Sequence, residues 1–268
     1  MEMFQYDFIQ RALLAGLAIS FITPILGLLL ILRRQSLLAD TLSHISLAGV
    51  ALGMILHLNP TLSTLLVVIF ASLIIEYLRV AYSNFSEISI AIMMSAGMAV
   101  ALILVGLSSN SANFKIDQYL FGSIILITSQ EVKLLMALAL ITLTLYFIFR
   151  RPLYVLCYDE DTAFTSGLPV KLMSIIFSVV TGIAISVMMP IVGALLVSAL
   201  IVIPAATAIK ISSSFAQSIL IAFAINLIGI FSGISASYYI DTPPGASITL
   251  SFVLIFLLVS LVGWFKQS

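Results

Sequence analysis

The chain has 268 residues and a mass of 28.9 kDa; 62% of its residues are hydrophobic, only 8% are charged, and the mean hydropathy is +1.26. Soluble domains are roughly 45–50% apolar and about 25% charged, so this chain has too few charges to cover a soluble surface. The composition excludes a water-soluble enzyme, a nucleic-acid binder and a disordered regulator, and it predicts a polytopic membrane protein. The net charge of zero indicates no class of partner, and the single cysteine, Cys157, cannot form an internal disulfide.

A helix needs about 20 apolar residues to cross a bilayer. Nine segments meet this requirement, namely 8–32, 37–57, 62–82, 88–107, 131–149, 171–189, 191–210, 215–238 and 246–265. Pro190 and Pro204 bracket the seventh, so eight spans are the alternative if one segment is re-entrant. The first apolar run lacks a small-residue cleavage site, which argues against a signal peptide. We expect an all-α membrane bundle of eight or nine helices, with residues 1–268 forming a single transmembrane domain.

Lysine and arginine indicate the orientation of the chain. With nine spans, one side of the membrane carries Arg33, Arg34, Arg79, Arg150, Arg151, Lys171, Lys210 and Lys266. The other side carries only Arg11, Lys115 and Lys133. Because cytoplasmic loops are enriched in these residues, we expect the first side to be cytoplasmic, with the amino terminus outside and the carboxyl terminus inside.

Two connecting segments are longer than the others. The outer one, 108–130, contains an apolar stretch, 119–125, that is too short to span, and we expect a short or re-entrant helix packed on protein. The inner one, 150–171, contains the acidic run 159–161 and is expected to carry a short surface helix. No phosphate-binding loop of the type G-x-x-x-x-G-K-[ST] and no metalloprotease or serine-hydrolase motif is present. The chain is therefore not expected to be an enzyme, and any ATP that it uses is hydrolysed by another chain.

The candidates for chemistry are ionisable residues within the spans, because charges there are costly. Asp40 and His44 are four residues apart, which places both side chains on one face of the second span. A carboxylate and an imidazole suit Zn²⁺ or Mn²⁺. The same pair could also form a structural hydrogen bond or a proton relay, and the spacing alone leaves these three interpretations open.

The other ionisable residues have simpler interpretations. His57 lies elsewhere around the helix from His44 and is expected at the outer membrane interface, and Glu76 with Arg79 is expected to form a local ion pair. Asp117 and Asp241 lie on the outer side, where they either cap turns or form an acidic mouth that attracts cations or docks a partner. Two G-x-x-x-G spacings, at 49–53 and 229–233, allow close helix packing within a bundle or between subunits.

Four blocks of sequence, in order, resemble the permease subunits of bacterial ATP-binding-cassette importers for zinc and manganese. They are RRQSLLADTLSHISLAGVA at 33–51, YLFGS at 119–123, VGALLVS at 192–198 with PAA at 204–206, and YYIDTPPGASI at 238–248. The resemblance runs almost end to end. The residues around Thr41 and Ser46 are closer to the zinc branch of Gram-positive bacteria, since manganese permeases more often show alanine after the aspartate and proline before the glycine.

The resemblance implies roles for particular residues. Asp40 and His44 would contact the metal in the translocation path. The segment 161–167, DTAFTSG, is similar to the coupling element that docks in a groove of the ATPase, which would involve Asp161, Ala163 and Gly167. The implied function is ATP-driven uptake of zinc, which is a substrate and not a permanent cofactor, across the bacterial plasma membrane.

The implied assembly is a homodimer of the permease in the lipid bilayer, with two cytoplasmic ATPase subunits and an extracellular metal-binding protein; no nucleic acid is involved. The alternatives are a manganese importer, a related importer for iron–siderophore or cobalamin, and a proton-coupled secondary transporter that uses Asp40 and His44 as a relay. An intramembrane enzyme would need a nucleophile with a base or a complete metal motif, and neither is evident in the sequence.

Overall fold

The computed structural model describes residues 6–82, 86–107, 116–122, 127–240 and 242–267, and this part of the chain is helical with no strands. The helices are α1 Asp7–Leu32, α2 Ser36–Ile55, α3 Pro60–Ala81, α4 Ser86–Leu107, α5 Ile116–Phe121, α6 Ser129–Tyr158, α7 Glu160–Thr165, α8 Val170–Val192, α9 Ala194–Ile211, α10 Phe215–Ile240 and α11 Pro244–Gln267. Among the described residues, nine helices are long and apolar enough to cross a membrane. This confirms the all-α membrane bundle and the nine-span count.

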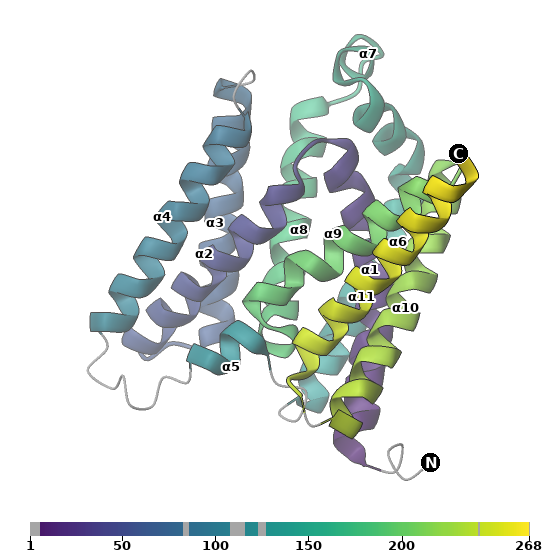
Figure 1. The fold of residues 1–268 in the computed structure, drawn as a ribbon. Coiled ribbons are helices and arrows are strands. Elements are labelled where there is room, and N and C mark those ends of the chain that lie inside the picture. The colour runs from purple at the N-terminus through teal and green to yellow at the C-terminus, as the bar shows by residue number, and fades with distance from the viewer. Residues whose placement is uncertain (1–5, 83–85, 108–115, 123–126, 241, 268) are drawn as a thin grey trace.

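The long helices alternate in direction, and the two chain termini lie at opposite ends of the bundle, as an odd number of crossings requires (Figure 1). We call these ends the α7 end, which also holds the turn 33–35 and the end of α11, and the α5 end, which holds the start of α1 and the junction of α8 with α9. Helix α2 packs with α3 and α4, α10 packs with α9 and α11, and α1 packs with α6, α9 and α10. Helices α8 and α9 also contact α2 and so join the two groups.

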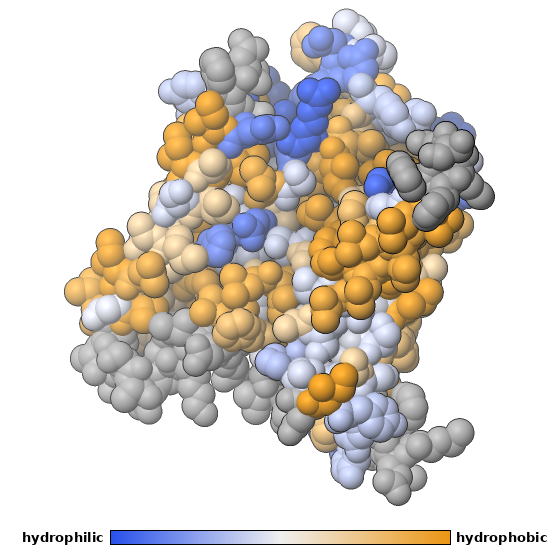
Figure 2. Space-filling model, viewed as in Figure 1, coloured by the Kyte–Doolittle hydropathy of each residue, from blue (hydrophilic) through white to orange (hydrophobic). Residues whose placement is uncertain are grey.

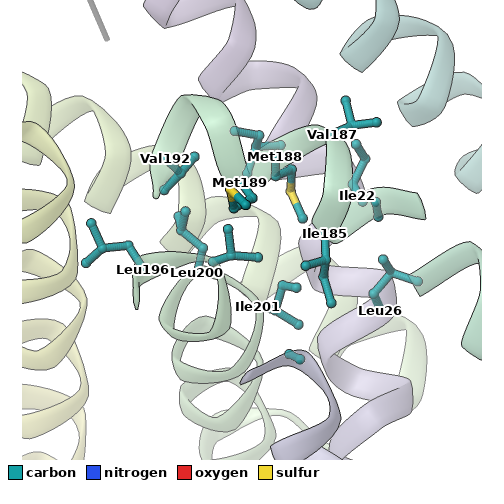
Figure 3. Close-up of a cluster of buried hydrophobic side chains, with 14 of the residues drawn as sticks. Ile22, Leu26, Ile185, Val187, Met188, Met189, Val192, Leu196, Leu200 and Ile201 are labelled. Atoms are coloured by element: carbon teal, nitrogen blue, oxygen red, sulfur yellow. The ribbon is translucent and has the colours of Figure 1, made fainter. Parts of the chain in front are cut away.

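The centre of the bundle is built from α1, α8 and α9. Figure 3 shows Ile22 and Leu26 of α1 facing Ile185, Met188 and neighbouring side chains of α8 and α9. These side chains are buried almost completely. A close-packed core of this kind fixes α8 and α9 relative to α1, because the side chains leave no space into which the helices could slide.

Two boundaries differ from the sequence prediction. Helix α8 continues through Pro190 to Val192, so the break lies at Gly193, whose φ of +98° ends the helix. Proline is tolerated in membrane helices because neighbouring groups satisfy the freed backbone. Helix α6 likewise continues through Pro152 to Tyr158, so the first nine residues of the predicted inner loop 150–171 are its last turns.

Helix α5 packs against the break between α8 and α9. A Cβ atom at Gly193 would lie 2.4 Å from the carbonyl oxygen of Leu120, and one at Gly122 would lie 2.3 Å from the carbonyl carbon of Val192. Only glycine allows backbones to approach this closely. The expected short helix packed on protein is therefore confirmed as α5, Ile116–Phe121, while residues 123–125 of the apolar stretch lie outside the described residues.

The two G-x-x-x-G pairs pack helices of the same chain against each other. A Cβ at Gly49 or Gly53 would meet α3, and one at Gly229 or Gly233 would meet Phe252 or Ile248 of α11. Of the two interpretations that the sequence allowed, the structure therefore shows packing within the bundle. Small residues at this spacing let helix backbones approach in a bilayer.

Candidate functional site

Asp40 and His44 lie together on one face of α2, as their spacing predicts. Nε2 of His44 is 3.8 Å from Oδ2 of Asp40, which is longer than a hydrogen bond. The side chain of Asp40 is 34% exposed and that of His44 is 11% exposed. The pair therefore opens onto the surface of the single chain without being bonded together.

The surroundings of the pair leave its polar atoms free. The hydroxyls of Thr41, Ser43 and Ser46 all donate to backbone carbonyls, so they do not hold the carboxylate or the imidazole. Nδ1 of His44 is buried and has no hydrogen-bond partner among the described residues. Buried polar atoms are almost always bonded, so the unbonded Nδ1 atom is an unusual feature of this site.

The pair is set in an apolar face. Figure 2 shows a small hydrophilic patch over α2 with apolar side chains around it. Asp40 and His44 are the only ionisable residues of α2. Among the described residues no group of three or more His, Cys, Asp and Glu side chains could hold a metal ion. Zinc in proteins usually takes four ligands, so the described residues do not form a complete zinc site.

A second polar cluster lies at the α7 end and is larger than the sequence predicted. The ion pair between Glu76 and Arg79 is present, with Nη2 of Arg79 2.8 Å from Oε1 of Glu76. Arg79 also pairs with Glu160, the first residue of α7, at 3.2 Å. The three-residue spacing predicted the local pair, but no local pattern could reveal a partner 81 positions away.

Helix α7 is held by its own caps. The side chain of Asp159 accepts hydrogen bonds from the backbone N–H groups of Asp161 and Thr162 and from the hydroxyl of Thr162. The hydroxyl bond from Thr162 is the largest of the causes that lower the pKa of Asp159 below its usual value. At the other end, Gly167 has a φ of +79°. Its N–H donates to the carbonyl oxygen of Phe164, and the N–H of Leu168 donates to the carbonyl oxygen of Ala163. This is the glycine-terminated helix end known as a Schellman motif.

The three predicted coupling residues occupy different environments. Asp161 is exposed in the first turn of α7. Ala163 is completely buried and packs with Leu156, Val170 and Met173 of the same chain. A small residue is therefore required at position 163 for packing within the chain. The resemblance of 161–167 to a coupling element did not predict this. The large hydrophobic side chain exposed on α7 is that of Phe164, which is 72% exposed.

The outer-side candidates are far less defined. Asp117 lies in α5, but its side chain is outside the described part of the structure. Asp241 lies outside the described residues. His57 is exposed at the α5 end with a φ of +55°, in the turn that follows α2, so it does not share the face of His44. Cys157 is buried and reduced.

Comparison with known families identifies the class of protein. The model of the ABC 3 transport family matches residues 5–263. The chain therefore belongs to the ABC 3 transport family, and it is a multi-pass membrane protein of a transport system. The match covers the first eight long helices and α11 as far as residue 263.

Individual relatives have similar lengths. A protein named "probable metal transport system membrane protein" from Treponema pallidum is 31% identical over 258 residues, which is 96% of each chain. A "high-affinity zinc uptake system membrane protein ZnuB" from Buchnera aphidicola is 29% identical and covers 94% of this chain and 97% of its own. The "manganese import system permease protein ScaB" of Streptococcus parasanguinis is 28% identical, with 95% and 90% covered.

A solved structure has the same fold. A chain of PsaBC from Streptococcus pneumoniae, determined in complex with a Fab, superimposes with a TM-score of 0.84 at 28% identity. The alignment covers 96% of this chain and 92% of that one. The resemblance to zinc and manganese importer permeases that the four sequence blocks indicated is thereby confirmed.

Proposed function

We propose that this chain is the membrane permease of an ATP-driven importer for a divalent metal ion, with zinc as the preferred substrate. The observation that carries this proposal is the Asp40–His44 pair, which opens onto an otherwise apolar face of α2. The relatives are named for both zinc and manganese, so the metal is the first question for experiment.

The pair suits a transient site. Carboxylate oxygen and imidazole nitrogen are ligands of Zn²⁺, and both also accept Mn²⁺. Two ligands from one chain bind weakly, which would let the ion leave again. A second copy related by two-fold symmetry would bring another carboxylate and another imidazole to the same axis, and four ligands would match the tetrahedral preference of zinc. We therefore propose a homodimer in which the two α2 faces line the path.

The two ends of the bundle are the proposed binding sites of the other two components, the ATPase and the external metal-binding protein. The α7 end carries most of the lysines and arginines and is assigned to the cytoplasm, so that the amino terminus lies outside and the carboxyl terminus inside. At this end α7, with Asp161 and exposed Phe164, would contact a separate ATPase. Ala163 and Gly167 would stabilise the conformation of α7 that makes this contact. An external metal-binding protein would dock at the α5 end, near Asp117 and Asp241.

A proton-coupled secondary transporter is the second candidate. It is supported by the same pair, since a carboxylate and an imidazole can pass a proton. It requires no ATPase, however, and gives no role to a capped and exposed helix such as α7. The two candidates differ in their energy source, which makes them separable by one measurement.

The test is uptake of radioactive zinc and manganese by cells that carry the chain with its ATPase and binding protein. Asp40→Asn preserves size and most hydrogen bonding but removes the anion, so zinc uptake should fall to background. Asp7→Asn, an equivalent change at an exposed position in the first turn of α1, is the matched control and should transport normally. Full zinc uptake by Asp40→Asn would show that this site assignment is wrong.

The energy source is tested in the same cells. When the proton gradient is dissipated and ATP is maintained, wild-type uptake should continue if the chain is an ATP-driven permease. Uptake that collapses under these conditions would instead identify a proton-coupled transporter, for which Asp40→Asn would also be inactive.

A further inference from the structure

The cluster at the α7 end joins three segments of the chain, α3, α7 and α8, through Arg79. Its Nε and Nη2 atoms donate to Oε1 of Glu76 at 3.1 and 2.8 Å, and its Nη1 and Nη2 atoms donate to Glu160 at 3.3 and 3.2 Å. Nη2 also lies 3.3 Å from the hydroxyl of Ser174 on α8. The planar guanidinium thus bridges two carboxylates at once, which a lysine could not do in the same geometry.

The two halves of this bridge differ in their surroundings. Glu76 is buried and also accepts a hydrogen bond of 3.1 Å from Ser178 of α8. Separating a buried carboxylate from its partner is expensive, so Arg79 is fixed to α3 and α8. Glu160 is 45% exposed and lies in a short helix beside a cavity lined by Arg33, Arg34 and Arg79. The contact with α7 is therefore the half that can open.

The bridge also reaches the start of the helix that carries the proposed metal ligands. Arg33, in the turn before α2, donates to the same Ser174 hydroxyl and lies over the ring of Phe177, 5.5 Å from its centroid. Burial and the nearby charge of Arg79 lower the pKa of Arg33 below its usual value. The guanidinium groups of Arg33 and Arg79 thus meet at the Ser174 hydroxyl, and the nearby carboxylates of Glu76 and Glu160 partly offset their charges.

Charge balance links α7 to this turn. With Glu160 in place, the charges of Glu76 and Glu160 offset those of Arg33 and Arg79, while Arg34, which lines the same cavity, adds a further positive charge. If α7 moves away with Glu160, one more positive charge is left uncompensated and the arginines repel one another more strongly. Arg33 precedes Asp40 by seven residues, which is two helical turns, so a shift of the turn displaces the α2 end nearest to the metal pair.

We propose that Arg79 is a positioning residue for transport, which transmits the displacement of α7 through Glu160 to α3, α8 and the start of α2. This inference rests on the proposed function, because it assumes that an ATPase moves α7. The inference adds to the proposed function the route by which the movement of α7 reaches the translocation path beside α2. Neither Arg79 nor Glu160 belongs to the proposed metal pair, Asp40 and His44.

The experiment uses the purified permease with its ATPase and binding protein in proteoliposomes, and it measures zinc ions transported per ATP hydrolysed. Glu160→Gln removes the charge without changing the size and leaves buried Glu76 paired with Arg79. ATP hydrolysis should persist while the ions transported per ATP fall about fivefold, the smallest effect expected of a coupling of this kind. Glu87→Gln, at an exposed glutamate in the first turn of α4 at the same end, is the matched control and should leave the ratio unchanged.

Two further variants separate transmission from a structural role. Glu160→Asp keeps the charge on a shorter side chain and should retain more of the ratio than Glu160→Gln, whereas a purely steric role would be damaged more by the shorter residue. Arg79→Gln with Glu160→Gln should lose no more than Arg79→Gln alone, because Arg79→Gln already removes the ion pair with Glu160.

The outcomes distinguish this inference from the proposed function. If wild-type proteoliposomes transport zinc and Glu160→Gln has the wild-type ratio, the route through Arg79 is wrong and the proposed function stands. Losses that add in the double variant, or a greater loss in Glu160→Asp than in Glu160→Gln, would also overturn the route. If the wild-type complex transports neither zinc nor manganese, the proposed function fails and this inference fails with it.

Discussion

The close crossing of α2 and α3 should make Gly49 intolerant even of alanine. A Cβ at this position would lie 2.6 Å from Cα of Thr64, and 3.3 Å from both the Thr64 nitrogen and Cβ of Val67. The nearest atom belongs to the backbone, so no side-chain rotation relieves the overlap. The helices must separate until this distance reaches the 3.4 Å of an ordinary contact.

The expected cost follows from this overlap. Inserting one carbon into a well-packed interface destabilises a protein by about 1–3 kcal/mol, which corresponds to a fall in Tm of several degrees for a chain of this size. Because α2 carries His44 five residues before Gly49, the same shift should also lower zinc uptake. The assay is thermal unfolding of the purified chain in nanodiscs, together with uptake in cells.

Gly106→Ala provides the control for Gly49→Ala. Gly106 also lies in a long apolar helix, α4, but a Cβ there would have no neighbour within 4 Å. Exchange of a helical glycine for alanine at such a site is neutral or stabilises by about 0.5–1 kcal/mol. If Gly49→Ala melts at the same temperature as Gly106→Ala, the reasoning from the α2–α3 crossing is refuted.

Two other predictions concern α7 and the topology. Ala163→Leu should weaken the attachment of α7 by about 1–3 kcal/mol because Ala163 is fully buried against Leu156, Val170 and Met173; faster proteolysis within 159–169 would reveal this, and proteolysis at the wild-type rate would contradict it. Gly167→Val should act in the same direction because its φ is +79°. Reporter fusions should indicate the cytoplasm after Ser36, Asn84, Asp159 and Ser213, and the outside after Asn59, Asn110 and Thr242. An outside signal after Asp159 would separate α7 from any ATPase.

The amino-acid sequence by itself determined the features that depend on local pattern. Runs of apolar residues of membrane-spanning length predicted nine helices, and nine are found among the described residues. The four-residue spacing of Asp40 and His44 placed them on one face of α2 because the helix repeats every 3.6 residues. The glycine spacings indicated close helix packing for the same reason.

The tertiary structure alone decided which distant segments meet. The sequence could not show that Gly49 packs against α3 in the same chain, that Ala163 is buried, or that Arg79 reaches Glu160. The sequence also predicted a helix boundary at Pro190, but the helix ends at Gly193. At Gly193 the backbone of α5 approaches too closely for any side chain. These features arise from contacts between residues far apart in the chain, and local periodicity carries no information about them.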